Sequence, residues 1–198
     1  MPLCVLGIGS NKPYKEMPGE VLLGLAVDKL SGILGGIRVS PVYRSAALHV
    51  TDQPAFLNAA VSGFFPAAGL ASPAGGKKAV SRAARKLLDA VMAIETAYGR
   101  DRASERRWGE RSLDIDILLF GEEIINEPDL VVPHPRLAER AFALLPLLDL
   151  LPDAAAPETK RPYRKILEAL PPQELRRKGY LLPEGDGVYS CYRWKALP

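Results

Sequence analysis

The sequence predicts an α+β fold of the ferredoxin-like kind, in which an antiparallel sheet is covered by helices on one face. Two observations lead to this prediction. Short apolar runs with strand character and longer segments with apolar residues at helical spacing follow one another in the order β-α-β-β-α-β. A short hairpin and further helical segments come after this core, and no repeat of the solenoid type is found.

Glycines end the first two elements of the predicted core. A first strand ends at Gly9-Ser10-Asn11, and an amphipathic helix ends at Gly35-Gly36. A polar, irregular stretch over residues 43–54 separates the second and third strands. The expected elements are a strand over 3–8, a helix over 20–34, and strands over 37–42 and 56–65.

The second half begins with the clearest helical pattern of the chain, which continues over five turns and stops at Gly99. A fourth core strand ends at Gly121, and Asn126-Glu127-Pro128-Asp129 forms the turn of a hairpin. The expected elements are a helix over 79–98, a strand over 113–120, hairpin strands over 122–125 and 130–132, helices over 136–151 and 163–170, and a strand over 188–194.

The length of 198 residues fits one domain with an appendage. We expect a single domain over residues 1–170 and a C-terminal extension of unknown role over 171–198. Residues 66–78 are rich in alanine, glycine, proline and serine without any period, so they predict a flexible loop inserted before the second core helix.

The composition, 47% apolar and 25% charged with a net charge of +3, is ordinary for a globular protein. No window approaches the length of a membrane span, and the N-terminal run Met1 to Leu6 is read as a strand rather than a signal peptide. The two cysteines, Cys4 and Cys191, lie at opposite ends of the chain and are expected to be free thiols. These observations predict a cytoplasmic location.

The most informative stretch for chemistry is Leu113 to Phe120. On a strand, Asp114 and Asp116 project to one face, whereas Ile115 and Ile117 point to the other. Two neighbouring carboxylates repel each other unless a cation joins them, and Mg²⁺ prefers one or two carboxylates together with substrate phosphates. The alternative is two solvated aspartates, each near an arginine.

The loop that leads into this strand is rich in arginine rather than lysine, which favours bidentate phosphate contacts. Its basic residues are Arg100, Arg102, Arg106, Arg107 and Arg111. A metal pair beside an arginine loop suits transfer from a nucleoside triphosphate. Trp108 could cap a flat ligand or anchor the loop, and a solvated charged loop is the alternative for the whole segment.

Familiar nucleotide and metal motifs are missing. Gly75-Gly76-Lys77-Lys78 lacks the first glycine and the final Ser or Thr of a P-loop, and Gly7-Ile8-Gly9 lacks the third glycine of a dinucleotide fingerprint. Only two histidines, His49 and His134, accompany the distant cysteines, so a zinc site is not expected.

The sequence resembles the 6-hydroxymethyl-7,8-dihydropterin pyrophosphokinase family of folate biosynthesis, in order from residue 3 to about 153. The most specific block is Arg107-Trp108-Gly109-Glu110-Arg111-Ser112-Leu113-Asp114-Ile115-Asp116-Ile117-Leu118. Four further blocks support it: residues 7–11, 39–44, 52–61 and 132–136. The resemblance implies transfer of pyrophosphate from ATP to a hydroxymethyl pterin, giving AMP and the pterin diphosphate.

The resemblance also implies roles for individual residues. Asp114 and Asp116 would bind two Mg²⁺ ions, with Arg111 and Arg107 acting on the phosphates in the transition state. The implied ATP-binding set is Glu95, Arg102, Arg107, Trp108, Arg111, Ile117, His134 and Arg140. The implied pterin-binding set is Ser45, Ala46, Leu48, Phe56, Asn58, Trp108, Asp114 and Phe142.

The pterin assignments have a physical basis, because two aromatic rings can sandwich a flat heterocycle and an amide can read its polar edge. For Phe56 and Phe142, core packing is the alternative. The chain also departs from the family: the arginine loop is one residue longer near Ala103-Ser104, so Arg106 and Arg107 could exchange roles. Asp129 replaces a basic residue of some members, and Pro135 replaces an aromatic one.

Two other functions are compatible with parts of the same pattern. A nucleotidyl or single-phosphoryl transferase could use the same metal pair. An RNA-binding module of the ferredoxin-like type could use the arginines and aromatics, but no block of the RNP type is present. We therefore predict an ATP- and Mg²⁺-dependent pyrophosphokinase that acts as a monomer on small molecules, with neither nucleic acid nor membrane as a partner.

Overall fold

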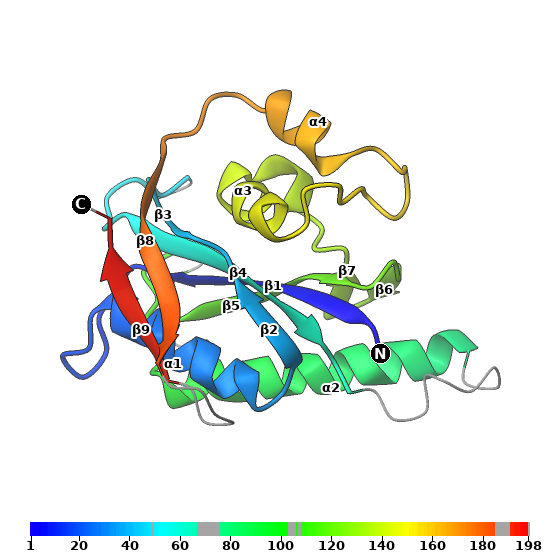
Figure 1. Cartoon of the computed structure of the whole chain (residues 1–198), viewed down its shortest axis with the longest axis horizontal. Helices are drawn as coiled ribbons and strands as arrows, with labels where there is room; N and C mark the ends of the chain where they lie inside the picture. The colour runs from blue at the N-terminus through cyan, green and yellow to red at the C-terminus, as the bar shows by residue number, and fades with distance from the viewer. Residues whose placement is uncertain (49, 67–75, 103–105, 107, 185–190, 198) are drawn as a thin grey trace.

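The computed structural model describes residues 1–48, 50–66, 76–102, 106, 108–184 and 191–197. Mixed helices and strands alternate along the chain (Figure 1). The elements are β1 Leu3–Ser10, α1 Gly19–Ser31, β2 Gly35–Val39, β3 Val42–Ser45, β4 Phe56–Phe64, α2 Gly76–Ala97, β5 Asp114–Phe120, β6 Ile125–Glu127, β7 Leu130–Val132, the 3₁₀ helix η1 Leu137–Glu139, α3 Ala141–Leu150, α4 Tyr163–Glu168, β8 Leu175–Glu184 and β9 Cys191–Ala196.

Seven strands of the described residues form one sheet in the order β5-β1-β4-β3-β8-β9, with β2 also paired to β4. All these pairings are antiparallel, and β6 and β7 form a separate hairpin. The predicted α+β class with an antiparallel sheet is therefore confirmed. Strand β1 lies between β4 and β5, so both of its edges are paired (Figure 1).

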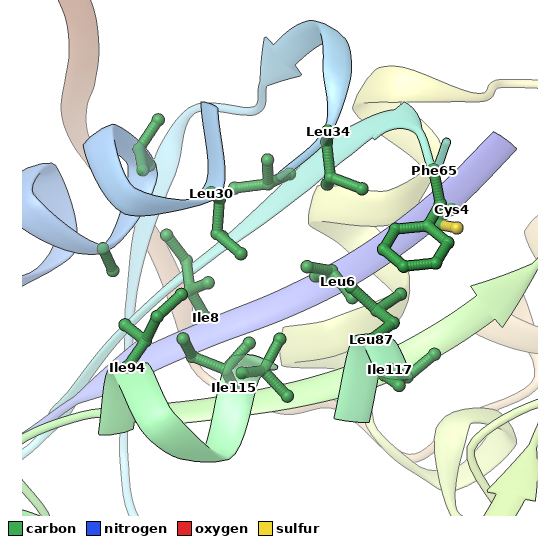
Figure 2. Close-up of a cluster of buried hydrophobic side chains, with 14 of the residues drawn as sticks. Cys4, Leu6, Ile8, Leu30, Leu34, Phe65, Leu87, Ile94, Ile115 and Ile117 are labelled. Atoms are coloured by element: carbon green, nitrogen blue, oxygen red, sulfur yellow. The ribbon is translucent and has the colours of Figure 1, made fainter. Parts of the chain in front are cut away.

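The prediction that helices cover one face of the sheet is wrong, because both faces are covered (Figure 1). On one face α1 and α2 pack over Cys4, Leu6 and Ile8, which alternate along β1 (Figure 2). On the other face α3 and α4 pack over Val5 and neighbouring apolar residues of β5. The alternation along β1 thus supplies both cores, since its side chains point to opposite faces in turn.

A bulge in β5 changes which side chains reach each core. The pairing with β1 shifts between Val5 and Leu6, so Leu118 is left without a direct partner. Ile117 belongs to the core beneath α2, whereas Leu118 and Leu119 both contact the core beneath α3. Asp114 and Asp116 precede the bulge and keep their shared face.

The predicted strand over 37–42 is divided into β2 and β3. Pro41 has no N–H group, so it cannot continue the ladder with β4. Next to Pro41, the Ala60 N–H of β4 donates to Ser40 Oγ at 2.8 Å, so a side chain rather than a main-chain carbonyl is its acceptor. Strand β3 therefore begins at Val42 and occupies residues 43–45, which the sequence analysis wrongly assigned to irregular structure.

Three other parts of the predicted secondary structure differ from the structure. Helix α2 begins at Gly76, inside the predicted loop over 66–78, and residues 67–75 lie outside the described residues. Strand β8 was not predicted, and it joins the main sheet by pairing with β3. The last predicted strand, over 188–194, corresponds to β9 at Cys191–Ala196, and its predicted residues 188–190 lie outside the described residues.

Candidate functional site

The site is centred on two glycines of β1. In the sheet register Gly9 lies opposite Asn58 of β4 on one side and Asp114 of β5 on the other. Gly7 likewise lies opposite Asp116. Neighbouring strands are about 4.8 Å apart, so the amide and the carboxylates face the same space at about 10 Å from each other. A side chain at position 9 would crowd Asn58, since a Cβ there would lie 3.3 Å from its Oδ1.

A cavity of about 820 Å³, which includes its open mouth, lies over these glycines. Strands β1, β3, β4 and β5, the start of α3 and the two loops that precede β4 and β5 all contribute to its walls. The predicted residues that line it are Ser45, Ala46, Leu48, Phe56, Asn58, Trp108, Arg111, Asp114, Asp116, Arg140 and Phe142.

The two aspartates have different electrostatic surroundings. Asp114 forms ion pairs with Arg100 and with Arg111, the latter at 3.1 Å. Burial raises the pKa of Asp114, but the charges of Arg100 and Arg111 outweigh burial and hold the pKa below its ordinary value. Burial raises the pKa of Asp116 to about 7, and the negative charge of Asp114 adds to this effect. The negative charge of Asp116 is therefore less well compensated by nearby cations than that of Asp114.

Glu95 of α2 supports this pair from below the sheet. Its side chain is 1% exposed, and its Oε1 accepts a hydrogen bond from Ile115 N at 2.8 Å. Ile115 stands between the two aspartates, so this bond fixes the strand that carries them. Glu95 also pairs with Arg100 and Arg102, although burial keeps its pKa raised. Arg100, predicted only as one of the loop arginines suited to phosphate, joins Glu95 to Asp114.

The turn after α2 directs Arg100 into the site. Gly99 has a φ of +87°, a region that favours glycine, and a Cβ there would overlap the Tyr14 ring. The Arg100 N–H then donates to Glu95 O at 3.0 Å. Gly99 is therefore required both for the backbone conformation and for the close approach of Tyr14.

His134 and Arg140 lie on the other side of Asp116. Their nitrogens are 3.7 and 3.5 Å from Asp116 Oδ2. Burial, together with the charge of Arg140, lowers the pKa of His134 to about 4, so the imidazole is neutral at neutral pH. Its Nδ1 accepts a hydrogen bond from Arg136 N at 3.2 Å. This bond assigns the proton to Nε2, which faces Asp116 as a donor.

The apolar end of the cavity is formed by Phe56 and Phe142. Asn58 is buried beside them, and its Nδ2 donates a hydrogen bond to Ser45 Oγ at 2.9 Å. This bond orients the amide and leaves its Oδ1 beside Gly9. Leu48 is 45% exposed at the rim of the cavity. Two rings, an oriented amide and an open rim are suited to a flat, polar-edged heterocycle.

A network of amides that the sequence analysis missed connects the loops around the cavity. Asn11 Nδ2 donates to Gln53 Oε1 at 3.0 Å, and Asn11 Oδ1 accepts from Arg111 N at 2.8 Å. Gln53 Nε2 in turn donates to Trp108 O at 2.9 Å. Both amides lie within sequence blocks that carried the family resemblance, which was the available signal. The Trp108 ring also packs against Arg136, whose guanidinium carbon is 3.9 Å from the ring centroid.

Some predicted residues lie away from the cavity lining. Ile117 is buried in the core beneath α2, and Glu95 is buried beneath Asp114. Arg102 is 52% exposed and pairs with Glu95. Arg107 lies outside the described residues, so its predicted contact with phosphate stays a prediction.

The donors at the site fit Mg²⁺. Asp114 and Asp116 supply carboxylate oxygens on one face, and the raised pKa of Asp116 indicates a carboxylate that a cation would stabilise. The described residues contain no cluster of three or more His, Cys, Asp or Glu placed to enclose a metal. Magnesium bound through two carboxylates completes its coordination with phosphate oxygens and water, so a third protein carboxylate is not needed.

Comparisons with known proteins identify the family of this chain. Residues 74–152 match the family model of 7,8-dihydro-6-hydroxymethylpterin-pyrophosphokinase (HPPK). The 2-amino-4-hydroxy-6-hydroxymethyldihydropteridine pyrophosphokinase of Pseudomonas aeruginosa is 41% identical over 71% of this chain and 76% of its own length. The enzyme of the same name from Methylorubrum extorquens is 37% identical over 89% of this chain and 99% of its own length.

A solved structure shares the fold. The crystal structure of wild-type Plasmodium falciparum HPPK-DHPS superposes with a TM-score of 0.58 and 15% identity, covering 85% of this chain. The match spans 43% of the Plasmodium chain, which is less than half of that protein. With relatives above 30% identity that are covered over most of their length, the chain belongs to the 7,8-dihydro-6-hydroxymethylpterin-pyrophosphokinase family.

Proposed function

We propose that this protein transfers the pyrophosphoryl group of ATP to 6-hydroxymethyl-7,8-dihydropterin, giving AMP and the pterin diphosphate in folate biosynthesis. One observation carries the proposal: a single cavity holds Asn58 and two phenylalanines at one end and the Asp114–Asp116 pair at the other. This arrangement supports an aromatic acceptor next to a phosphate site. The activity is the one that the names of the bacterial relatives describe.

In the proposed reaction, the hydroxymethyl oxygen of the pterin attacks the β-phosphorus of ATP. The new bond joins this oxygen to the β-phosphorus, the bond from the β-phosphorus to the α–β bridging oxygen breaks, AMP leaves, and the hydroxyl proton is released to water. Asn58 and the two rings would hold the acceptor with its alcohol directed toward Asp114 and Asp116. Such positioning lowers the barrier by fixing the two reactants in a reactive geometry.

Charge at the phosphates would be offset by the cationic residues around the aspartates. The side chains of Arg111, beside Asp114, and of Arg140, beside Asp116, are each 14% exposed. Neutral His134 would donate a hydrogen bond from its Nε2–H to a phosphate oxygen and would remain uncharged. Two Mg²⁺ ions held by Asp114 and Asp116 would neutralise phosphate charge and orient the phosphates when bound.

Replacing Asp116 tests this proposal. We expect Asp116→Asn to lower kcat/KM for AMP formation by about 100-fold or more, since it removes a carboxylate needed for the phosphate site. The amide is isosteric, so the far-UV circular dichroism should not change. The matched control is Asp153→Asn, at an exposed aspartate beyond α3, which should keep wild-type turnover.

Chromatography of the products decides between transfer mechanisms. The wild-type protein with ATP, Mg²⁺ and the pterin alcohol should give AMP and the pterin diphosphate in equal amounts, and EDTA should abolish both. Formation of ADP would refute pyrophosphoryl transfer and favour a single-phosphoryl kinase. Near-normal AMP production by Asp116→Asn would refute the role of this carboxylate.

The proposal also covers the ligands of the protein. ATP, the pterin and two Mg²⁺ ions are the proposed ligands. The ferredoxin-like description of the sheet, the monomeric state and the cytoplasmic location stay predictions. No helix in the described part of the chain has the length and apolar character that a membrane crossing requires.

A further inference from the structure

The first turn of α3 carries two side chains into the cavity. Arg140 is the N-cap residue of α3, and Phe142 is the second residue of the helix. Arg140 lies 3.5 Å from Asp116, and Phe142 lines the aromatic end of the cavity. The position of this helix start therefore affects both halves of the site.

This helix start has no capping side chain of its own. The Arg140 side chain makes no cap hydrogen bond, so the first N–H groups of α3 need acceptors from elsewhere. Gln173, which follows α4, supplies one: its Oε1 accepts from Ala141 N at 3.1 Å. Its Nε2 donates to Glu139 O at 3.2 Å. The same amide therefore holds the backbone on both sides of Arg140.

The strand after Gln173 holds the other end of α3. Asp149, in the last turn of the helix, accepts a hydrogen bond from Tyr43 Oη at 2.6 Å. Arg177 of β8 donates to Tyr43 Oη at 2.9 Å and lies 3.4 Å from Asp149. In the sheet, Leu175 of β8 pairs with Ser45, the partner of Asn58. The C-terminal segment thus contacts α3 at both ends and the strand beside the amide that faces the cavity.

We propose that Gln173 is a positioning residue for pterin binding, acting through the first turn of α3. The proposal rests on the function proposed above and gives the C-terminal extension a role in it. Without Gln173, the Ala141 N–H lacks its acceptor and the start of α3 moves relative to β5. Phe142 then stacks less closely on the pterin, and Arg140 loses its fixed distance from Asp116.

Substitutions at Gln173 separate the hydrogen bond from side-chain volume. Gln173→Met keeps the length but has no amide, whereas Gln173→Glu keeps the acceptor for Ala141 N. The matched control is Lys178→Met, an exposed position of β8, the strand that follows Gln173. The readout is calorimetric binding of 6-hydroxymethyl-7,8-dihydropterin in the presence of Mg²⁺ and a non-hydrolysable ATP analogue.

The dissociation constant for the pterin should rise about fivefold in Gln173→Met, comparable with loss of a helix cap. Gln173→Glu should give a smaller loss than Gln173→Met, because it keeps the acceptor for Ala141 N but replaces the Nε2 donor to Glu139 O with an oxygen. Lys178→Met should stay within about twofold of wild type. A Gln173→Met protein that binds the pterin as tightly as wild type would overturn the proposal, as would equal losses in Gln173→Met and Gln173→Glu.

A double-mutant cycle with Phe142→Ala distinguishes positioning from a general loss of structure. If Gln173 acts through Phe142, Gln173→Met should add little to the loss already caused by Phe142→Ala. Two losses that simply multiply would contradict the proposal. Wild-type protein that binds no pterin would instead refute the proposed function, and this result would be known before any variant is compared.

Discussion

At the scale of single residues, the buried aspartates and the buried cysteine of this protein have different surroundings. Asp114 and Asp116 are partly buried beside four basic side chains, which is the environment of a functional site. Cys4 is fully buried on β1 among apolar side chains, with α1 and α2 over it (Figure 2). The first environment suits binding of charged ligands, and the second suits packing alone.

The Cys4 thiol should therefore be inert in the folded protein. Burial raises its pKa from 9.0 to about 12, so the reactive thiolate at pH 8 is on the order of one molecule in 10⁴. We expect iodoacetamide at pH 8 to leave the Cys4 peptide unmodified in the native protein and to modify it after unfolding in about 8 M urea. Peptide mass spectrometry is the measurement. Rapid modification of Cys4 in native protein would show that this side chain reaches solvent.

At the scale of elements, α1 and β9 approach each other without an intervening side chain. A Cβ on Gly24 of α1 would lie 2.5 Å from Tyr192 O of β9. Asp28, one turn further along α1, accepts a hydrogen bond from Tyr192 N at 2.7 Å. The glycine and the aspartate together fix how the last strand of the sheet packs on the first helix.

Gly24→Ala should destabilise the protein by about 1–3 kcal/mol, because the added methyl group collides with backbone. This loss should exceed the gain of about 1 kcal/mol that alanine gives a helix over glycine. Gly32→Ala is the matched control, since a Cβ there has its nearest neighbour at 3.5 Å. Urea unfolding followed by circular dichroism measures both. Equal stability of the two variants would mean that α1 and β9 separate at little cost.

At the scale of the whole molecule, the C-terminal segment is part of the main sheet. Strand β8 covers the edge of β3 through the pairs Val42–Gly179, Tyr43–Arg177, Arg44–Arg176 and Ser45–Leu175. Leu181 joins the core between the sheet and the helices α1 and α2, with Trp194 of β9 packed against it. Removal of this segment would expose a strand edge and apolar core together.

A chain that ends at Leu170 tests the predicted domain boundary. We expect its melting temperature to fall by about 10 °C or more relative to the full chain, since several buried apolar groups are lost. We also expect it to aggregate through the exposed edge of β3. Differential scanning calorimetry and size-exclusion chromatography are the measurements. A truncated chain that melts like the full one would support an independent domain over residues 1–170.

The sequence could predict the features that depend on local pattern. Apolar spacing predicted α1, α2 and β5, and the alternation along Leu113 to Phe120 placed Asp114 and Asp116 on one face. Pro41 is a local sign of the division of β2 from β3 that the strand prediction did not use, whereas the hydrogen bond from Ala60 N to Ser40 Oγ joins residues 20 positions apart and could not be predicted. The strand prediction also missed β8, whose pairing partner β3 is more than 100 residues earlier.

By itself the sequence determined the chemistry of this protein: the carboxylate pair, the arginine loop, the aromatic and amide candidates, and the family that they share. Only the tertiary structure decided how these groups meet. Gly9 places Asn58 and Asp114 on opposite sides of one cavity, Glu95 and Arg100 support the carboxylates from beneath, and Gln173 holds the start of α3. The reason is physical: side-chain type and period are local properties, whereas register, burial and long-range hydrogen bonds exist only after distant segments have packed.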